Sequence, residues 1–158
     1  MAAWQVVFHV VPRGSVPPPP KRLAPAELDA TDWWAGAAFP ADYARRLAAM
    51  APLVRSSSAD LQTWGAADGN RIDVVSVGGR VSRVMVRVDV RRLDSKFGAA
   101  LIDLMRVADA ALVRNDGLVL ERTIAAYSGA LRGSNAWKYA SDPIAFLAAE
   151  QLRDDDDS

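Results

Sequence analysis

The segment RIDVVSVGGRVSRVMVRVDVRR, residues 71–92, specifies a long β-hairpin. Two runs rich in valine and isoleucine, 71–77 and 80–92, flank Gly78-Gly79, which is the pattern of two strands joined by a two-residue turn. Side chains of a strand alternate between its two faces. One face of the second run then carries Ser82, Val84, Val86, Val88 and Val90, and the other carries Arg83, Met85, Arg87, Asp89 and Arg91. We expect the valine face to lie in the core.

A helix is expected directly after the hairpin. Asp94 or Ser95 can cap it, because short polar side chains accept hydrogen bonds from the free N–H groups of a first turn. Apolar residues recur at helical spacing along residues 97–108. This helix should lie on the apolar face of the sheet.

The rest of the chain adds a strand at residues 4–11, a helix at 40–50 and a bend or short hairpin around Asp116-Gly117. Thr123 can cap a further helix that ends at Gly133. Asp142-Pro143 is a helix start signal, and the final helix has an apolar side. That side contains Ile144, Phe146, Leu147 and Leu152.

This order of elements favours an α+β fold: a mainly antiparallel sheet with a central long hairpin, packed against helices on one face. A chain of 158 residues with 51% hydrophobic residues suits one hydrophobic core. We expect residues 1–153 to form a single α+β domain. Residues 154–158 contain four consecutive aspartates, which repel one another, and are expected to form a disordered acidic tail.

Composition excludes many kinds of site. The chain has no cysteine and a single histidine, His9, so thiolate zinc sites, cysteine nucleophiles and paired-imidazole sites are impossible. No glycine-rich phosphate loop precedes a helix, and we expect neither a metal nor another cofactor, nor catalysis. His9 lies in an apolar strand, which favours a packed core histidine.

The chain shows no run of about 20 apolar residues that could cross a bilayer. Residues 1–11 lack a basic leader and run into Pro12, so we expect no secretory signal and a cytoplasmic location.

The hairpin is the most polarised part of the chain, with six arginines and two aspartates in residues 71–92. Arg83, Arg87 and Arg91 share one face, so they could bind an acidic protein surface or a phosphate backbone. Two structural alternatives stay open: a solvated sheet face, or a face covered by helices that pair the arginines internally. Nucleic acid is disfavoured because no aromatic residue interleaves the arginines.

Trp33-Trp34 is an adjacent aromatic pair in a segment without strong periodicity. Core packing accounts for most tryptophans, but an exposed pair near arginines would make a protein-binding hot spot. The sequence leaves both interpretations open.

Residues 60–150 resemble small uncharacterised bacterial proteins. The resemblance runs through residues 64–74, 79–81 and 86–91, and then through Ser134-Asn135-Ala136 and residues 142–147. Such small, cysteine-poor proteins look similar to immunity proteins of bacterial toxin systems, which work by occluding a toxin. The resemblance implies no catalytic residues.

Two hypotheses of different classes follow. The first is a non-enzymatic interaction protein, with an immunity protein as one form, that contacts an acidic partner through Arg83, Arg87, Arg91, Trp33 and Trp34. The alternative is a small-molecule-binding protein or enzyme with a pocket between hairpin and helices, anchored by Asp73, Asp89 and an arginine. An open edge strand would also allow a homodimer.

Overall fold

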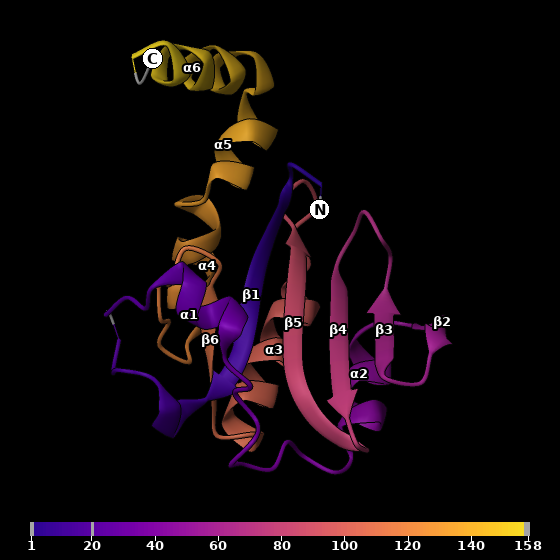
Figure 1. The fold of residues 1–158 in the computed structure, drawn as a ribbon. Helices are drawn as coiled ribbons and strands as arrows, with labels where there is room; N and C mark the ends of the chain where they lie inside the picture. The colour runs from indigo at the N-terminus through magenta and orange to yellow at the C-terminus, as the bar shows by residue number, and fades with distance from the viewer. Residues whose placement is uncertain (1, 20, 157–158) are drawn as a thin grey trace.

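The computed structural model describes residues 2–19 and 21–156, with side chains undescribed at 55–57 and 154–156. Six strands form one sheet in the order β2-β3-β4-β5-β1-β6, and every neighbouring pair is antiparallel. The strands are β1 (Gln5–Pro12), β2 (Leu53–Ser58), β3 (Leu61–Gly65), β4 (Arg71–Val77), β5 (Arg80–Asp89) and β6 (Ala110–Arg114). The predicted α+β class is confirmed (Figure 1).

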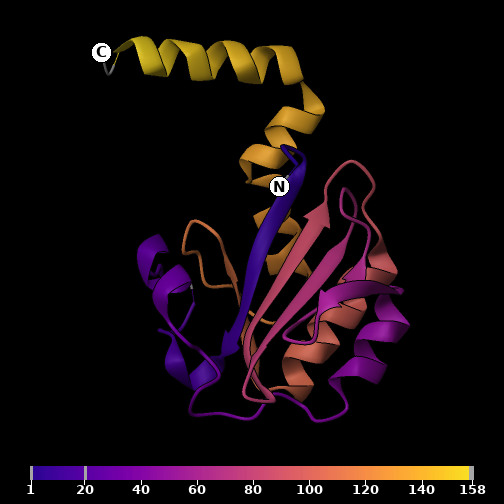
Figure 2. The same ribbon diagram turned by 45° about the vertical axis from the view of Figure 1, so that its right-hand side comes forward.

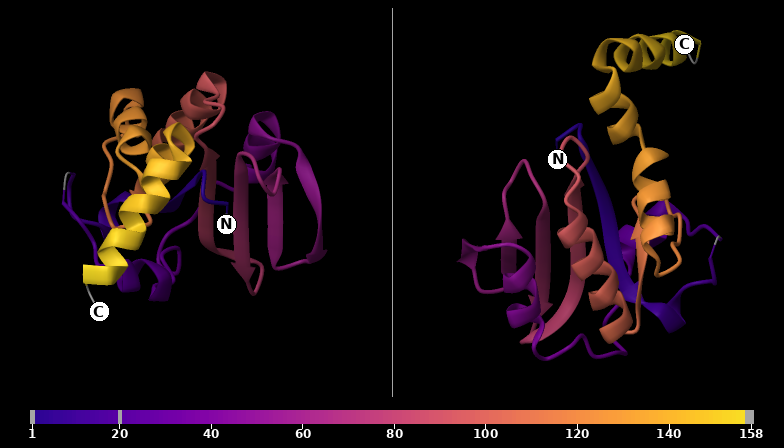
Figure 3. Two further views of the ribbon diagram at one scale, coloured as in Figure 1. Left: turned by 90° about the horizontal axis from the view of Figure 1, so that it is seen from above. Right: turned by 180° about the vertical axis from the view of Figure 1, so that it is seen from behind.

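The helices divide between the two faces of the sheet. They are α1 (Pro25–Ala30), α2 (Tyr43–Met50), α3 (Ser95–Val107), α4 (Ile124–Arg132), α5 (Asn135–Ser141) and α6 (Pro143–Asp156), with a short 3-10 turn at Arg13–Ser15. The view from behind shows α2, α3 and α4 on one face (Figure 3). Helix α1 lies on the opposite face, over β1 and β6 (Figure 1).

The hairpin forms as its sequence predicts. Gly78 and Gly79 both adopt positive φ, 59° and 76°, which is why glycine is needed at both turn positions. The register pairs Val74 with Val84 and Ile72 with Val86. These four side chains are buried on the face covered by α2, α3 and α4, so the valine face lies in the core as expected.

Helix α3 connects β5 to β6, which flank β1 and are both antiparallel to it. Its N-cap is Asp94, whose carboxylate accepts hydrogen bonds from the backbone N–H groups of Lys96 and Phe97 at 2.9 and 3.1 Å. Leu101 and Met105 are fully buried. The predicted cap and apolar side of this helix are both present.

Several features differ from the expectations. Strands β2 and β3 and helices α1 and α5 were not predicted from the sequence. Helix α6 continues to Asp156, so the chain is still helical at Asp154, where a disordered tail was expected to begin. Residues 157–158 lie outside the described residues.

Helix α6 extends away from the sheet and joins the rest of the molecule through α5 (Figure 2). Among residues 2–19 and 21–156, no helix is long and apolar enough to cross a bilayer.

Candidate functional site

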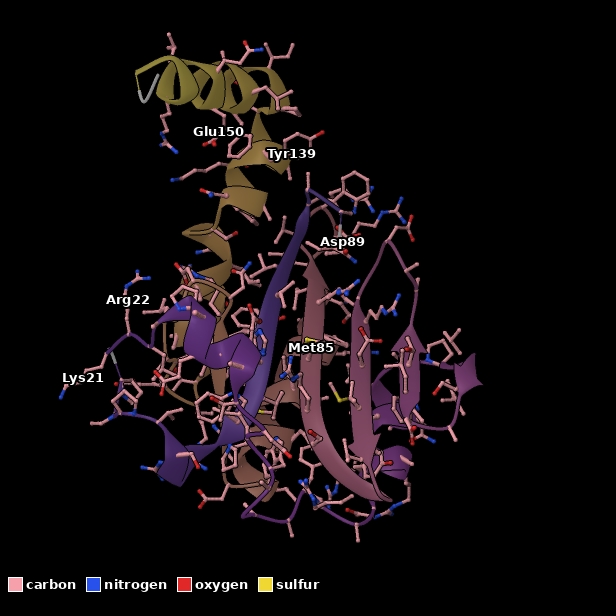
Figure 4. All side chains as sticks on the ribbon, viewed as in Figure 1. Lys21, Arg22, Met85, Asp89, Tyr139 and Glu150 are labelled. Atoms are coloured by element: carbon pink, nitrogen blue, oxygen red, sulfur yellow. The ribbon has the colours of Figure 1, made fainter. Side chains whose placement is uncertain are left out.

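Arg83 and Arg87 lie on one face of β5, opposite the valine face. The strand ends at Asp89, so Arg91 lies in the turn that follows it and the predicted strand to Arg92 is too long. Arg83 and Arg87 are half-buried and alternate with buried valines, as the sequence pattern predicts. Met85, between them, points to the side of the sheet on which α1 lies (Figure 4). Each arginine nevertheless has a partner within the chain, and these partners decide what the face can bind.

Arg83 is held by α1. Its Nη2 donates a hydrogen bond of 2.5 Å to the backbone carbonyl of Asp29. The Asp29 carboxylate also lies 3.8 Å from Nε2 of His9. This guanidinium therefore anchors α1 to the sheet.

His9 is buried beneath this contact, which agrees with the core histidine expected from the sequence. Burial lowers the pKa of its imidazole, with Asp29 opposing the shift and Arg83 adding to it. Its Nδ1 is buried without a hydrogen-bond partner among the described residues. The neutral ring is the form that this environment favours.

Arg87 lies above a buried carboxylate, Asp73, at an Nη2–Oδ2 distance of 4.0 Å. Asp73 accepts a hydrogen bond of 2.6 Å from the Thr63 hydroxyl and one of 2.9 Å from Nε of Arg71. The carboxylate is thus fully engaged by the sheet around it. These residues form an ionic network across β3, β4 and β5.

Arg91 lies just after the end of β5, beside the 68–70 turn. Its guanidinium carbon lies 4.0 Å from the ring centroid of Trp4, and its Nη2 is 2.9 Å from Oδ2 of Asp89. Burial opposes ionisation of Asp89, but the hydrogen bonds from Arg91 outweigh it and lower the pKa of this carboxyl. Arg91 also donates to the backbone carbonyl of Asp68 at 3.2 Å.

The arginine face is therefore a set of internal pairs. Of the alternatives left open by the sequence, internal pairing describes Arg83 and Arg91 best, although α1 covers only the Arg83 end. Their net attraction for an acidic partner is reduced, because each guanidinium already has an oxygen acceptor or a nearby carboxylate.

The tryptophan pair is buried, in agreement with the core packing that the sequence left open, and so offers little surface to a partner. Trp33 and Trp34 are 7% and 1% exposed. The Trp33 indole donates to the carbonyl of Leu28 at 3.1 Å, and the Trp34 indole donates to that of Val10 at 2.9 Å. Both rings serve the core, where Trp34 packs edge-on against Phe39.

Two hollows bear on ligand binding. One of about 1020 Å³ is polar and wide open, and lies between the 68–70 turn and the start of α3, with Asp89 and Arg91 in its lining. The other, of about 400 Å³, is mainly apolar and lies between α3 and α4. Its lining includes Leu93, Gly98, Ile124, Tyr127 and Leu131. Among the described side chains, those of residues 2–19, 21–54 and 58–153, no group of three or more acidic or histidine residues is arranged to hold a metal ion.

The most unusual surface lies on α6. Ile144, Leu147 and Leu152 have 83%, 53% and 67% of their surface exposed. At 3.6 residues per turn, Ile144, Ala148 and Leu152 are stacked along one side of the helix, with Leu147 beside them. We call these four residues the α6 apolar side.

The opposite side of α6 faces α5. Phe146 packs edge-on against Tyr139 with ring centroids 5.8 Å apart, and Glu150 pairs with Arg153 at 2.8 Å (Figure 4). An amphipathic helix usually turns its apolar side toward the core. Here most of the aliphatic residues point away from it.

The sequence identified the apolar residues of this helix but not their exposure. Spacing alone predicts an apolar side, and an apolar side is normally buried. The exposure follows from the position of α5, which carries α6 beyond the sheet (Figure 2).

Comparison of the chain with protein-family models, curated proteins and solved structures gives no match in any of the three. No residue role is carried over from a relative, and the resemblance to immunity proteins stays a prediction.

Proposed function

We propose that the chain is a non-enzymatic protein-interaction module that binds a partner protein through the α6 apolar side. The observation that carries this proposal is the exposure of Ile144, Leu147 and Leu152 on one projecting helix. Contiguous exposed apolar residues rimmed by polar ones are typical of protein-binding surfaces. A partner that covered these side chains would gain about 25 cal/mol for each Å² of apolar surface removed from water.

The proposed binding surface is the α6 apolar side instead of the arginine face expected from the sequence. The class of function, a non-enzymatic interaction protein, is the same. The paired arginines on β5 are part of the scaffold, whereas the α6 apolar side is free to contact another chain. An immunity protein that covers a toxin is one form of such a module, in which steric occlusion follows from binding.

The test is capture of a partner by the immobilised full chain, with variants that separate two exposed surfaces. Leu147→Glu places a charge in the α6 apolar side and should abolish capture. Ile124→Glu makes the same change at an aliphatic residue of α4 that is 49% exposed and should leave capture intact. Thermal unfolding of both variants checks that the fold persists. Binding that survives Leu147→Glu would refute the proposal.

A second candidate function is binding of a small apolar molecule in the hollow between α3 and α4. This hollow has about 400 Å³ and a mainly apolar lining, the properties expected of a ligand pocket. Ligands of this kind should raise the melting temperature of the wild type but not of Ala99→Phe, which fills the hollow. A library that stabilises neither would exclude this candidate.

A further inference from the structure

We infer that the hollow between α3 and α4 binds hydrophobic amines, which are molecules with an apolar body and one protonated amino group. The inference rests on the second candidate function, because it names the class of ligand for the same hollow. It follows from an apolar lining that contains one carboxylate and one tyrosine hydroxyl.

The apolar part of the lining suits a compact hydrophobic body. Tyr127 and Leu131 of α4 are buried and line the hollow, whereas Leu93 and Ile124, which also line it, are large aliphatic residues exposed to solvent. A bound molecule would cover the exposed parts of these two side chains and remove apolar surface from water. The volume of about 400 Å³ lies within the range of small-molecule sites, about 300–1,000 Å³.

Asp94 alone carries a charge among the described residues that line the hollow. Its Oδ1 accepts the hydrogen bonds that cap α3, from the backbone N–H groups of Lys96 and Phe97. Its Oδ2 forms no hydrogen bond or ion pair within the part of the chain that the structure describes. This oxygen is therefore free to accept from a ligand, and a carboxylate binds a charged N–H donor more strongly than a neutral one.

The Tyr127 hydroxyl is a second polar group on the same side of α3. A Cβ at Gly98 would lie 3.6 Å from Cζ of Tyr127, so the end of the ring that carries the hydroxyl lies against Gly98. Asp94 precedes Gly98 by one helical turn, and residues four apart lie on the same face of a helix. An amino group near Asp94 would thus be within reach of both side chains.

The hydroxyl is available to a ligand in its protonated form. Burial and the negative charge of Asp94 both raise the pKa of Tyr127, so the hydroxyl keeps its proton at neutral pH. Within the described residues it forms no hydrogen bond, and its oxygen can accept one from an amino group. The ring packs against Phe8 at a centroid distance of 5.9 Å, which holds the hydroxyl in place before a ligand binds.

The same groups select against other ligands of similar shape. A carboxylate would meet the like charge of Asp94, and the described lining contains no arginine or lysine to pair with it. Arg91, Arg92 and Lys96 line the polar hollow on the other side of Asp94 instead. An alcohol would fill the apolar part but would offer Asp94 only a neutral donor.

Three probes with one apolar body test the inference: phenylbutylamine, phenylbutanol and phenylbutyrate. Titration of the isotope-labelled full chain, followed by NMR, gives each dissociation constant and shows whether the Gly98 and Ser128 signals shift. The amine should bind about tenfold tighter than the alcohol, and the carboxylate more weakly than either. Equal affinities for amine and alcohol, or a preference for the carboxylate, would overturn the inference.

Two variants of α3 separate the charge of Asp94 from the stability of the helix. Asp94→Asn removes the charge but keeps a good N-cap residue, so the helix persists while the affinity for the amine falls about tenfold, to that of the alcohol. Asp103→Asn makes the same change at a carboxylate that is 72% exposed on the same helix and should leave all three affinities unchanged. A preference for the amine that survives Asp94→Asn would contradict the assigned role of Asp94.

The inference and the second candidate function fail in different ways. If amine and alcohol bind equally and Ala99→Phe abolishes the binding of both, the hollow is a site for apolar molecules and the amine selectivity is excluded. If none of the three probes shifts the Gly98 or Ser128 signals, both are excluded. The interaction module is independent of either outcome, because its surface is on α6.

Discussion

Thr63 and Asp73 lie directly opposite each other on β3 and β4 and share a buried hydrogen bond of 2.6 Å. The Asp73 side chain is only 4% exposed, and its other contacts are with Arg71 and Arg87. The carboxylate that the sequence offered as an anchor for a ligand is thus satisfied within the sheet. Its role in this structure is to join three strands.

Replacing Asp73 should therefore cost stability. Asp73→Ala is expected to lower the free energy of unfolding by about 1–3 kcal/mol, because the Thr63 hydroxyl and the Arg71 guanidinium lose their acceptor. Thr63→Val should cost about 1 kcal/mol. Urea denaturation measures both. Asp103→Ala, which removes only an exposed pair with Arg106, serves as control and should change stability by less than about 0.5 kcal/mol.

The Asp73 carboxylate also sets the result of reversing the charge of Arg87. Its Nη2 lies 4.0 Å from Oδ2 of Asp73, so Arg87→Glu brings two carboxylates together over a half-buried site. We expect a loss of about 1–2 kcal/mol in unfolding free energy, whereas Arg92→Glu in the exposed turn should be nearly neutral. Equal stability of the two variants would show that Arg87 is an independent surface group.

The pH dependence of stability should report on His9. Burial lowers its folded pKa below the ordinary value of 6.5, so the unfolded chain binds the proton more readily. Stability should therefore be full above about pH 6.5 and decline as the pH falls toward the folded pKa. Denaturation at several pH values between about 5 and 8 measures the effect.

The chain has one histidine, which makes the assignment direct. His9→Leu should remove the decline in that range, and the imidazole proton shifts of the wild type should titrate below the ordinary pKa. A titration at or above 6.5 would contradict the desolvated position of the ring.

The sequence predicted the elements whose pattern is local. The hairpin, the cap at Asp94 and the cap at Thr123 all depend on neighbouring residues, and the structure contains each of them, with the hairpin ending at Asp89. Strands β2 and β3 were missed because residues 53–65 are partly polar and become strands through pairing, β3 with β4 and β2 with β3. That pairing is a tertiary property, which overrides weak strand propensity.

The site was harder to predict for the same reason. Whether Trp33 and Trp34 are buried depends on the path of the 31–42 segment around the sheet. Composition does not predict that path. The partners of Arg83 likewise come from α1, which is distant in sequence. Of the candidate binding surface, the sequence predicted the apolar side of the last helix but not the exposure of that side.

Two helical glycines provide a matched test of the packing between α3 and α4. Gly129 in α4 has open space where a Cβ would lie, so Gly129→Ala should stabilise the protein by about 0.5–1 kcal/mol through helix propensity. A Cβ at Gly98 in α3 would lie 2.9 Å from Cε1 of Tyr127. The Tyr127 ring packs against Phe8 at a centroid distance of 5.9 Å and cannot move away freely.

Gly98→Ala should therefore lose the propensity gain and destabilise the protein by about 1–3 kcal/mol, the range typical of overpacking. Thermal unfolding of the two variants compares the same substitution in two helices, so the difference isolates the contact with Tyr127. Equal stabilisation by both would mean that α3 and α4 can separate without cost. That outcome would indicate a hollow between them that opens readily, and would favour the small-molecule candidate over a rigid scaffold.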